Sequence, residues 1–89
     1  MYIHLGQETV VRKSDIIGIF DLDTATVSKR TRDYLAKAEK AGKVINVSTE
    51  LPKSFVVCQK NNEQIIYISQ ISSSTLLKRS VESIENSLK

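Results

Sequence analysis

The sequence of 89 residues is poor in the residue types on which metal sites and many enzymes depend. It has one cysteine, Cys58, one histidine, His4, and no tryptophan. A single cysteine excludes an internal disulfide framework, and one histidine with one cysteine cannot form a zinc site. Cys58 lies in the apolar segment FVVCQ, away from His4 in sequence, so a small buried thiol is favoured over a nucleophile paired with a base.

Glycine and long apolar runs are also scarce. The three glycines, Gly6, Gly18 and Gly42, are isolated, so the sequence contains no glycine-rich phosphate loop. No stretch approaches the roughly 20 apolar residues of a membrane span. The first residues, YIHLGQ after the methionine, lack the basic start and apolar run of a secretory signal. These absences predict a soluble, cytoplasmic protein.

The chain has the length of one small domain. A domain of this size buries only about 60–65% of the surface that its unfolded chain exposes. Three tyrosines and two phenylalanines are enough for one thin core and leave little to line a deep cleft. Self-association would add buried surface.

Positive charge is concentrated in one segment. The net charge of the chain is +3, and residues 29–43 alone carry six basic and two acidic side chains. Such a local excess is typical of a surface that binds a polyanion. A solvated helix of an ordinary soluble protein can have the same composition, so charge alone leaves both interpretations open.

The apolar pattern predicts six short strands, expected at residues 2–5, 9–11, 16–21, 44–47, 54–59 and 64–71. Segment 16–21 is apolar at nearly every position, which predicts burial of both its faces. Gly18 within it indicates a bend or a close backbone approach. The sequence KNNE between the last two strands predicts a hairpin turn, because asparagine tolerates a positive φ.

A first helix is predicted between the third and fourth strands. Asp23 or Thr24 can cap it, and Gly42 supplies its C-terminal stop after about Ala41. Helical spacing predicts a core-facing stripe made of Val27, Thr31, Tyr34, Leu35 and Ala38. The basic residues Lys29, Arg30, Lys37 and Lys40 fall largely outside this stripe, so we expect them to face solvent or a partner.

A second helix is predicted at residues 75–88, after a cluster of capping residues at 72–75. Its apolar stripe contains Leu77, Val81, Ile84 and Leu88, and Leu76 widens it. The stripe can pack on the chain's own sheet or on a neighbouring molecule. The fold class is therefore α+β: a small, mainly antiparallel β-sheet with one packed α-helix and a C-terminal α-helix. It forms a single domain, 1–89, with a sheet-and-helix core at 1–71 and the C-terminal helix at 72–89.

The sequence Asp21-Leu22-Asp23-Thr24 follows an apolar strand and is similar to the first motif of haloacid-dehalogenase-type phosphatases. In that chemistry the first aspartate attacks phosphorus and the second acts as an acid and base beside Mg²⁺. The reaction also needs further metal-binding acids, and no acidic pair follows a strand in the second half of the chain. Helix capping by these carboxylates is the favoured interpretation.

Four segments, YIHLG, IIGIFD, PKSFVV and SSSTLLKR, resemble in order and spacing the RemB branch of the RemA/RemB family. These are small Firmicute proteins linked to regulation of extracellular-matrix (biofilm) genes. The resemblance implies a cytoplasmic, homo-oligomeric, β-rich domain. In the RemA branch, that domain binds DNA and activates transcription.

The positions that are basic in the RemA branch are partly changed here. Basic residues precede the first strand of the C-terminal hairpin in that branch, whereas only Lys53 is basic in this chain's LPKS. An arginine also precedes the third strand there, and Asp15 occupies that position here, with Arg12 and Lys13 nearby. Lysine contacts phosphate without the bidentate fork of arginine.

The sequence therefore predicts a non-enzymatic transcriptional regulator of matrix genes that binds double-stranded DNA as a homo-oligomer, without a metal or cofactor. The predicted DNA-binding residues are Lys53, Arg12 and Lys13 first, and Arg30, Lys37 and Lys40 second. Two alternatives remain open. One is a protein–protein interaction module that regulates through a partner and does not bind DNA. The other is a small phosphohydrolase that uses Asp21 and Asp23.

Overall fold

The structure is a computed structural model that describes the backbone of residues 2–88 and the side chains of residues 2–81. Strands β1 (Tyr2–Gly6) and β2 (Thr9–Arg12) form an antiparallel pair. A second sheet has the order β3-β5-β6-β4, made of β3 (Ile16–Asp21), β5 (Ser54–Lys60), β6 (Glu63–Ser69) and β4 (Val44–Asn46). Its strands are antiparallel except for β4, which runs parallel to β6.

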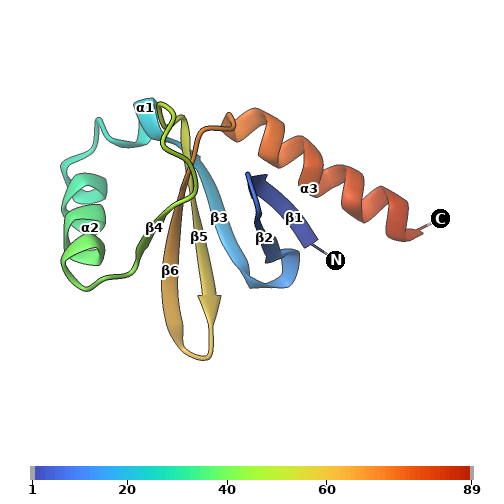
Figure 1. The fold of residues 1–89 in the computed structure, drawn as a ribbon, viewed down its shortest axis with the longest axis horizontal. Coiled ribbons are helices and arrows are strands. Elements are labelled where there is room, and N and C mark those ends of the chain that lie inside the picture. Colours follow the sequence, from blue (N-terminus) through green and yellow to red (C-terminus); the bar gives the residue numbers. More distant parts are fainter. Residues whose placement is uncertain (1, 89) are drawn as a thin grey trace.

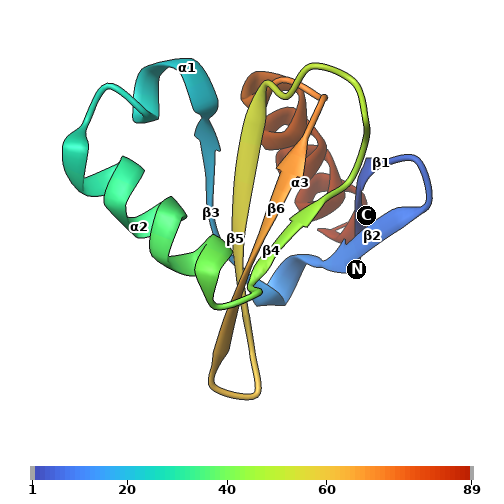
Figure 2. The same ribbon diagram turned by 60° about the vertical axis from the view of Figure 1, so that its left-hand side comes forward.

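The molecule has three layers, with the four-stranded sheet in the middle (Figure 1). Helix α2 (Lys29–Lys40) covers one face of this sheet. The β1–β2 pair and helix α3 (Ser73–Leu88) cover the other face, as the turned view in Figure 2 shows. A short 3₁₀ turn, η1 (Lys13–Asp15), joins β2 to β3, and one helical turn, α1 (Leu22–Ala25), follows β3. The predicted α+β fold is confirmed.

Strand β5 separates two hydrophobic clusters, because successive side chains of a strand point to opposite faces of its sheet. Val56 and Cys58 belong to the cluster under the β1–β2 pair and α3, together with Ile3, Leu5, Val11, Val47 and Leu76. Phe55 and Val57 belong to the cluster under α2, where Leu35 and Ala38 pack on them from the helix. The sheet is therefore buried on both faces along β5.

The first predicted helix is wrong in its extent. The chain forms two helices, α1 and α2, separated by residues 26–28. The capping residue is Asp21 instead of Asp23 or Thr24, since its side chain accepts a hydrogen bond from the Thr24 backbone N–H at 3.0 Å. The Arg32 guanidinium donates to the carbonyl oxygens of Thr26 (2.7 Å) and Val27 (3.0 Å). These bonds pair carbonyls that a continuous helix would satisfy itself.

This break changes the predicted core stripe of the helix. Val27 lies in the connection and is 77% exposed, so its placement in the core was wrong. Leu35 and Ala38 pack on the sheet as predicted, whereas Tyr34 is 39% exposed. The predicted stop is confirmed: Gly42 follows the helix with a φ of +73°, a conformation in which a side chain would be strained.

Strand β3 is less buried than its apolar sequence predicts. It lies at the edge of the sheet, and Ile17 and Phe20 are 55% and 43% exposed. Burial of both its faces was therefore a wrong prediction, because the covering layers are centred on β5 and β6. The bend expected at Gly18 is confirmed by a register shift between Ile16 and Gly18 in the pairing with β5, and an added Cβ at Gly18 would lie 2.6 Å from the Phe20 ring.

The hairpin turn and the cap of the C-terminal helix are confirmed. Asn61 and Asn62 connect β5 to β6 with φ values of +54° and +67°. The Ser72 hydroxyl accepts a hydrogen bond from the Thr75 backbone N–H at 3.3 Å, and α3 begins at Ser73. These local signals worked because the side chains concerned act on their own backbone.

The predicted stripe residues of α3 that the structure describes do not pack on the sheet; Leu76 does. Leu76 is fully buried, whereas Leu77 and Val81 are 49% and 54% exposed. The predicted stripe residues Ile84 and Leu88 lie outside the side chains that the structure describes. Among the described apolar side chains of the helix, Leu76 packs on the sheet, whereas Leu77 and Val81 face outward.

Replacement of Leu76 tests this assignment. We expect Leu76→Ala to lower the free energy of unfolding by about 2–5 kcal/mol, because it removes a buried side chain and leaves a cavity. The matched change Leu77→Ala removes the same atoms from a half-exposed position, so its cost should stay under about 1 kcal/mol. Urea denaturation of the two variants measures both values, and equal losses would contradict the assignment.

The buried thiol of Cys58 gives the fold a specific pH dependence. Burial, with a smaller contribution from Asp15, raises the pKa of Cys58 from an ordinary value near 9 to about 11. Between these pH values the unfolded thiol ionises while the folded thiol keeps its proton. Ionisation therefore stabilises the unfolded state relative to the folded state as the pH rises through this window.

We expect the free energy of unfolding to fall by about 1–2 kcal/mol more in the wild type than in Cys58→Val between pH 8.5 and pH 10.5, since one pKa unit corresponds to about 1.4 kcal/mol. The pKa of Tyr67 is also raised, mainly by burial, which both proteins share, and in smaller part by the charge of Cys58, which only the wild type carries. Urea denaturation at the two pH values measures the difference. Parallel pH profiles would show that Cys58 does not contribute.

Candidate nucleic-acid interface

The main chain of Lys53 is held firmly at one end of the four-stranded sheet. Its backbone N–H donates to the Ser69 carbonyl at 2.8 Å, and its own carbonyl accepts from the Leu22 backbone N–H at 3.0 Å. The residue stands directly before β5, and its side chain is exposed. Lys53 therefore presents a cation from a fixed backbone position beside the start of α1.

Arg12 and Lys13 lie at the opposite end of β3, where β2 passes through η1 into that strand. Arg12 is exposed, but Lys13 is half-buried, and its Nζ donates to the Ser80 carbonyl of α3 at 2.9 Å. Arg79 of α3 donates in turn to the His4 carbonyl of β1 at 2.9 Å. Two cationic side chains thus attach α3 to the β1–β2 layer, and Lys13 has a structural role that the sequence did not reveal.

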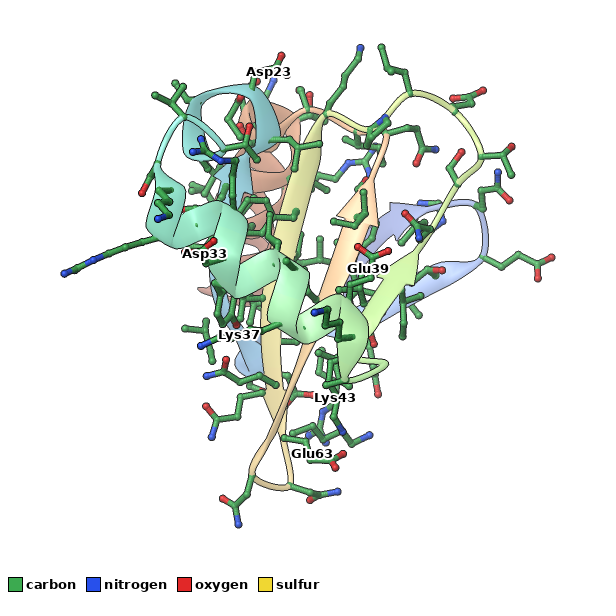
Figure 3. All side chains as sticks on the ribbon, turned by 90° about the vertical axis from the view of Figure 1, so that its left-hand side faces the viewer. Asp23, Asp33, Lys37, Glu39, Lys43 and Glu63 are labelled. Carbon is green, nitrogen blue, oxygen red and sulfur yellow. The ribbon has the colours of Figure 1, made fainter. Side chains whose placement is uncertain are left out.

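The second group of predicted residues lies on α2, as Figure 3 shows for Lys37. Arg30, Lys37 and Lys40 are exposed, as expected. Their spacings of seven and three residues place them on one side of the helix. Asp33 lies three residues after Arg30 and four before Lys37, so a carboxylate stands on the same side. The helix surface is therefore cationic but mixed.

The predicted residues do not form one continuous patch on a single chain. Arg12 and Lys53 lie next to opposite ends of β3, whose six residues span about 17 Å. The α2 residues belong to the layer on the other side of the sheet from β1, β2 and α3. A single molecule therefore presents three separate groups of cations.

Few of these cations are neutralised within the molecule. Among the side chains of residues 2–81, one ion pair is present, between Lys43 and Glu63 at 2.9 Å (Figure 3). Lys53, Arg12, Arg30, Lys37 and Lys40 take no part in it. Their charges remain available for a negatively charged partner.

Sequence reasoning missed Lys60, an exposed cation at the end of β5. Lys60 and Arg12 line the same hollow, although 48 positions separate them in the sequence. The alternation of β5 places Lys60 on the same face as Cys58, which was a usable signal. Its proximity to Arg12 depends on how the β1–β2 pair sits on the sheet, which the sequence does not indicate.

Asp21 and Asp23 have the geometry of a helix start. The Asp21 carboxylate accepts from the Thr24 backbone, and hydrogen bonds from the backbone and side chain of Thr24 lower the pKa of Asp21. Asp23 lies in the first turn of α1, where negative charge is favourable. The capping interpretation of this motif is confirmed at Asp21.

The remaining candidate ligands stay apart. His4 is exposed on β1, and its ring hydrogen-bonds the Gln7 carbonyl oxygen, whereas Cys58 is buried in the core. In the part of the chain that the structure describes, histidine, cysteine, aspartate and glutamate nowhere gather in groups of three or more that could hold a metal ion. None of the helices described here has the length and apolar character required to cross a membrane.

The fold and its surface thus define a small α+β protein with exposed cations in three separate groups. A family model described as extracellular matrix regulatory protein A-like (RemA-like) matches residues 2–79. The chain is also 46% identical over 79 residues to extracellular matrix regulatory protein B of Bacillus subtilis (strain 168), with 89% of each chain covered. The protein therefore belongs to the RemA-like family, and the resemblance found in the sequence is confirmed.

The different environments of Arg12 and Lys13 lead to a direct test. We expect Lys13→Ala to lower the free energy of unfolding by about 1–2 kcal/mol, because it removes a hydrogen bond from a charged donor to Ser80. Arg12→Ala makes the same change in charge one residue away and should alter stability by less than about 0.5 kcal/mol. Urea denaturation compares the two variants. Equal effects would mean that the contact between Lys13 and α3 contributes nothing.

Proposed function

We propose that this protein is a non-enzymatic transcriptional regulator of extracellular-matrix (biofilm) genes that binds double-stranded DNA as a homo-oligomer in the cytoplasm. The observation that carries the proposal is the match to the RemA-like family over residues 2–79. The relative in Bacillus subtilis is named an extracellular matrix regulatory protein. Five exposed cations without an ion pair in the described structure supply suitable chemistry for a polyanion.

The proposed binding is dominated by phosphate contacts. Lysine and arginine side chains that neutralise phosphates release condensed counterions, and this release favours binding without reading base sequence. Lys53 is the first residue proposed to make such a contact, because its backbone is fixed by two hydrogen bonds while its side chain extends into solvent. Arg12 is the second, and Arg30, Lys37 and Lys40 follow on α2.

The dispersed cations are the reason for proposing an oligomer. One chain has a net charge of +3 and presents its cations in three groups. Several copies would repeat each group, so that equivalent residues of neighbouring subunits contact successive phosphates along the duplex. Exposed apolar side chains, among them Leu51, Ile17 and Val81, are available for contacts between subunits.

A second candidate function is a protein–protein interaction module that regulates without binding DNA. It is favoured by Ile17 and Phe20, which line one hollow beside α2 and are 55% and 43% exposed. Neighbouring exposed apolar side chains of this kind are typical of a contact with another protein. Asp15 also places a negative charge close to Arg12 in sequence. A stoichiometric protein partner recovered without DNA would favour this function.

Binding to a matrix-gene promoter fragment across a salt series tests the proposal, with the oligomer mass measured by light scattering in the same buffer. We expect an oligomer whose affinity falls linearly, on logarithmic scales, with the salt concentration. Lys53→Ala should weaken binding and reduce the slope by about one for each subunit in contact. Lys78→Ala, an equal change in charge at an exposed position of α3, should leave both nearly unchanged.

Three outcomes would contradict the proposal. Salt-independent binding would rule out phosphate-dominated contacts. Equal losses in Lys53→Ala and Lys78→Ala would show that total charge, and not the position of Lys53, determines affinity. A well-formed oligomer that binds neither the promoter fragment nor a scrambled fragment would remove the DNA-binding function and leave the interaction module.

A further inference from the structure

A hollow of about 360 Å³ lies on the face of the central sheet that the β1–β2 pair covers. The β5–β6 hairpin extends beyond that pair, as Figure 1 shows at the Asn61–Asn62 end. Residues of β1, β2, η1, β5 and β6 line the hollow. The volume lies within the range of small-molecule sites, which begins at about 300 Å³.

The inner wall of this hollow is uncharged. Val11 and Cys58 are 8% and 5% exposed, and Ile65 continues the same wall from β6. Because burial raises the pKa of Cys58 to about 11, its side chain is a neutral thiol at physiological pH. Apolar contact is therefore what the inner wall offers to a ligand.

The remaining lining is aromatic and charged. Tyr2 and Tyr67 contribute two phenol rings from β1 and β6. Arg12 and Lys60 contribute two cations from β2 and β5, and among the side chains described neither takes part in an ion pair or a hydrogen bond. Asp15 contributes one carboxylate from η1, on which a ligand's N–H donor can bind.

We propose that the hollow lined by Tyr2, Arg12, Asp15, Cys58, Lys60 and Tyr67 binds a nucleotide, with its aromatic base against the tyrosines and the inner wall and its phosphate at Arg12 and Lys60. Tyrosine rings stack with bases of any sequence. Arginine binds phosphate through two parallel hydrogen bonds, and lysine binds it as a point charge. An exocyclic amino group of the base would donate to Asp15.

Simpler ligands fit this lining less well. Inorganic phosphate would use the two cations and leave the apolar inner wall in contact with water. An uncharged aromatic molecule would cover that wall but leave both cations without a counterion. A divalent metal ion would find one carboxylate, which is far short of the oxygen ligands that such ions require.

The nucleotide can be a free molecule or part of a nucleic acid, because both present a ring and a phosphate. The site itself does not depend on the proposed DNA binding. One consequence does rest on that function: Arg12 is shared, so a free nucleotide should compete with DNA for it. The hollow would then let a small molecule regulate the DNA-binding surface.

Methyl NMR of the full-length protein, without DNA, tests the site. The Ile65 methyl group reports on the hollow, and the methyl groups of Leu35, which pack from α2 on the other face of the sheet, serve as the control. We expect GMP and AMP to shift the Ile65 signal in a saturable way and to leave the Leu35 signals unchanged. Guanosine alone and inorganic phosphate alone should bind at least about tenfold more weakly, because each makes half of the contacts.

Variants assign the phosphate contacts. Arg12→Gln and Lys60→Gln should each weaken GMP binding by about fivefold in calorimetry, as expected for the loss of one exposed charge contact. Lys78→Gln makes the same change in charge on α3, outside the hollow, and should leave GMP affinity unaltered. A short single-stranded oligonucleotide is titrated in parallel. A shift of the Ile65 signal by GMP shows that a free nucleotide can occupy the hollow, whereas a shift by the oligonucleotide alone assigns the site to nucleic acid.

Several results would overturn the proposal. One is the absence of a saturable Ile65 shift with either mononucleotides or the oligonucleotide at millimolar concentration. Another is an equal affinity for phosphate and GMP, which would leave an anion site without ring recognition. Retained GMP affinity in Lys60→Gln would remove the assigned phosphate contact. Promoter binding is measured separately, so the nucleotide site and the DNA-binding function can each fail alone.

Discussion

Burial of both faces of β5 is the constraint on which the rest of the structure depends. Its first five residues are buried, and the strand is paired with β3 on one side and β6 on the other. Full burial of a valine or phenylalanine side chain stabilises a fold by about 1.5–3 kcal/mol. Phe55 and Val57 provide this burial under α2, and Val56 provides it under the β1–β2 pair. One strand therefore holds two covering layers that do not contact the same side chains.

This arrangement also determines where charge can lie. Because both faces of the central strands are occupied by the core, the exposed cations of the described residues lie at strand ends, in loops and on the surfaces of α2 and α3. Arg12, Lys53 and Lys60 stand at or beside the ends of strands, and Lys37 lies on the helix surface. The doubly covered sheet keeps Lys53 and Lys37 apart from the hollow that Arg12 and Lys60 share. Repetition of the subunit is the physical route by which such dispersed charges can act together on a long polyanion.

The local features of the fold were predictable because they depend on neighbouring residues. Asn61 and Asn62 turn the hairpin and Gly42 ends α2 through their positive φ angles, and Ser72 caps α3 through its hydroxyl. The family resemblance was likewise contained in short segments of the sequence. Two predictions, the continuous helix and the buried β3, were wrong because an apolar pattern in the sequence does not show whether another layer of the fold covers that segment. Val27 has the correct spacing for a core residue but no layer above it, and Ile17 stands on an uncovered edge.

The sequence by itself determined the strands, the presence of helices after β3 and at the C-terminus, the family and the types of residue available for contact with a polyanion. Tertiary structure decided which of those residues are free to act. Lys13 and Arg12 are neighbours with the same charge, but the Ser80 carbonyl of α3 accepts a hydrogen bond from Lys13, whereas Arg12 stays exposed. Lys60 comes near Arg12 only because the β1–β2 pair packs on β5. The apolar pattern of the sequence shows which side chains belong to the core. The packing of elements that are distant in sequence decides which polar atoms each cationic side chain contacts.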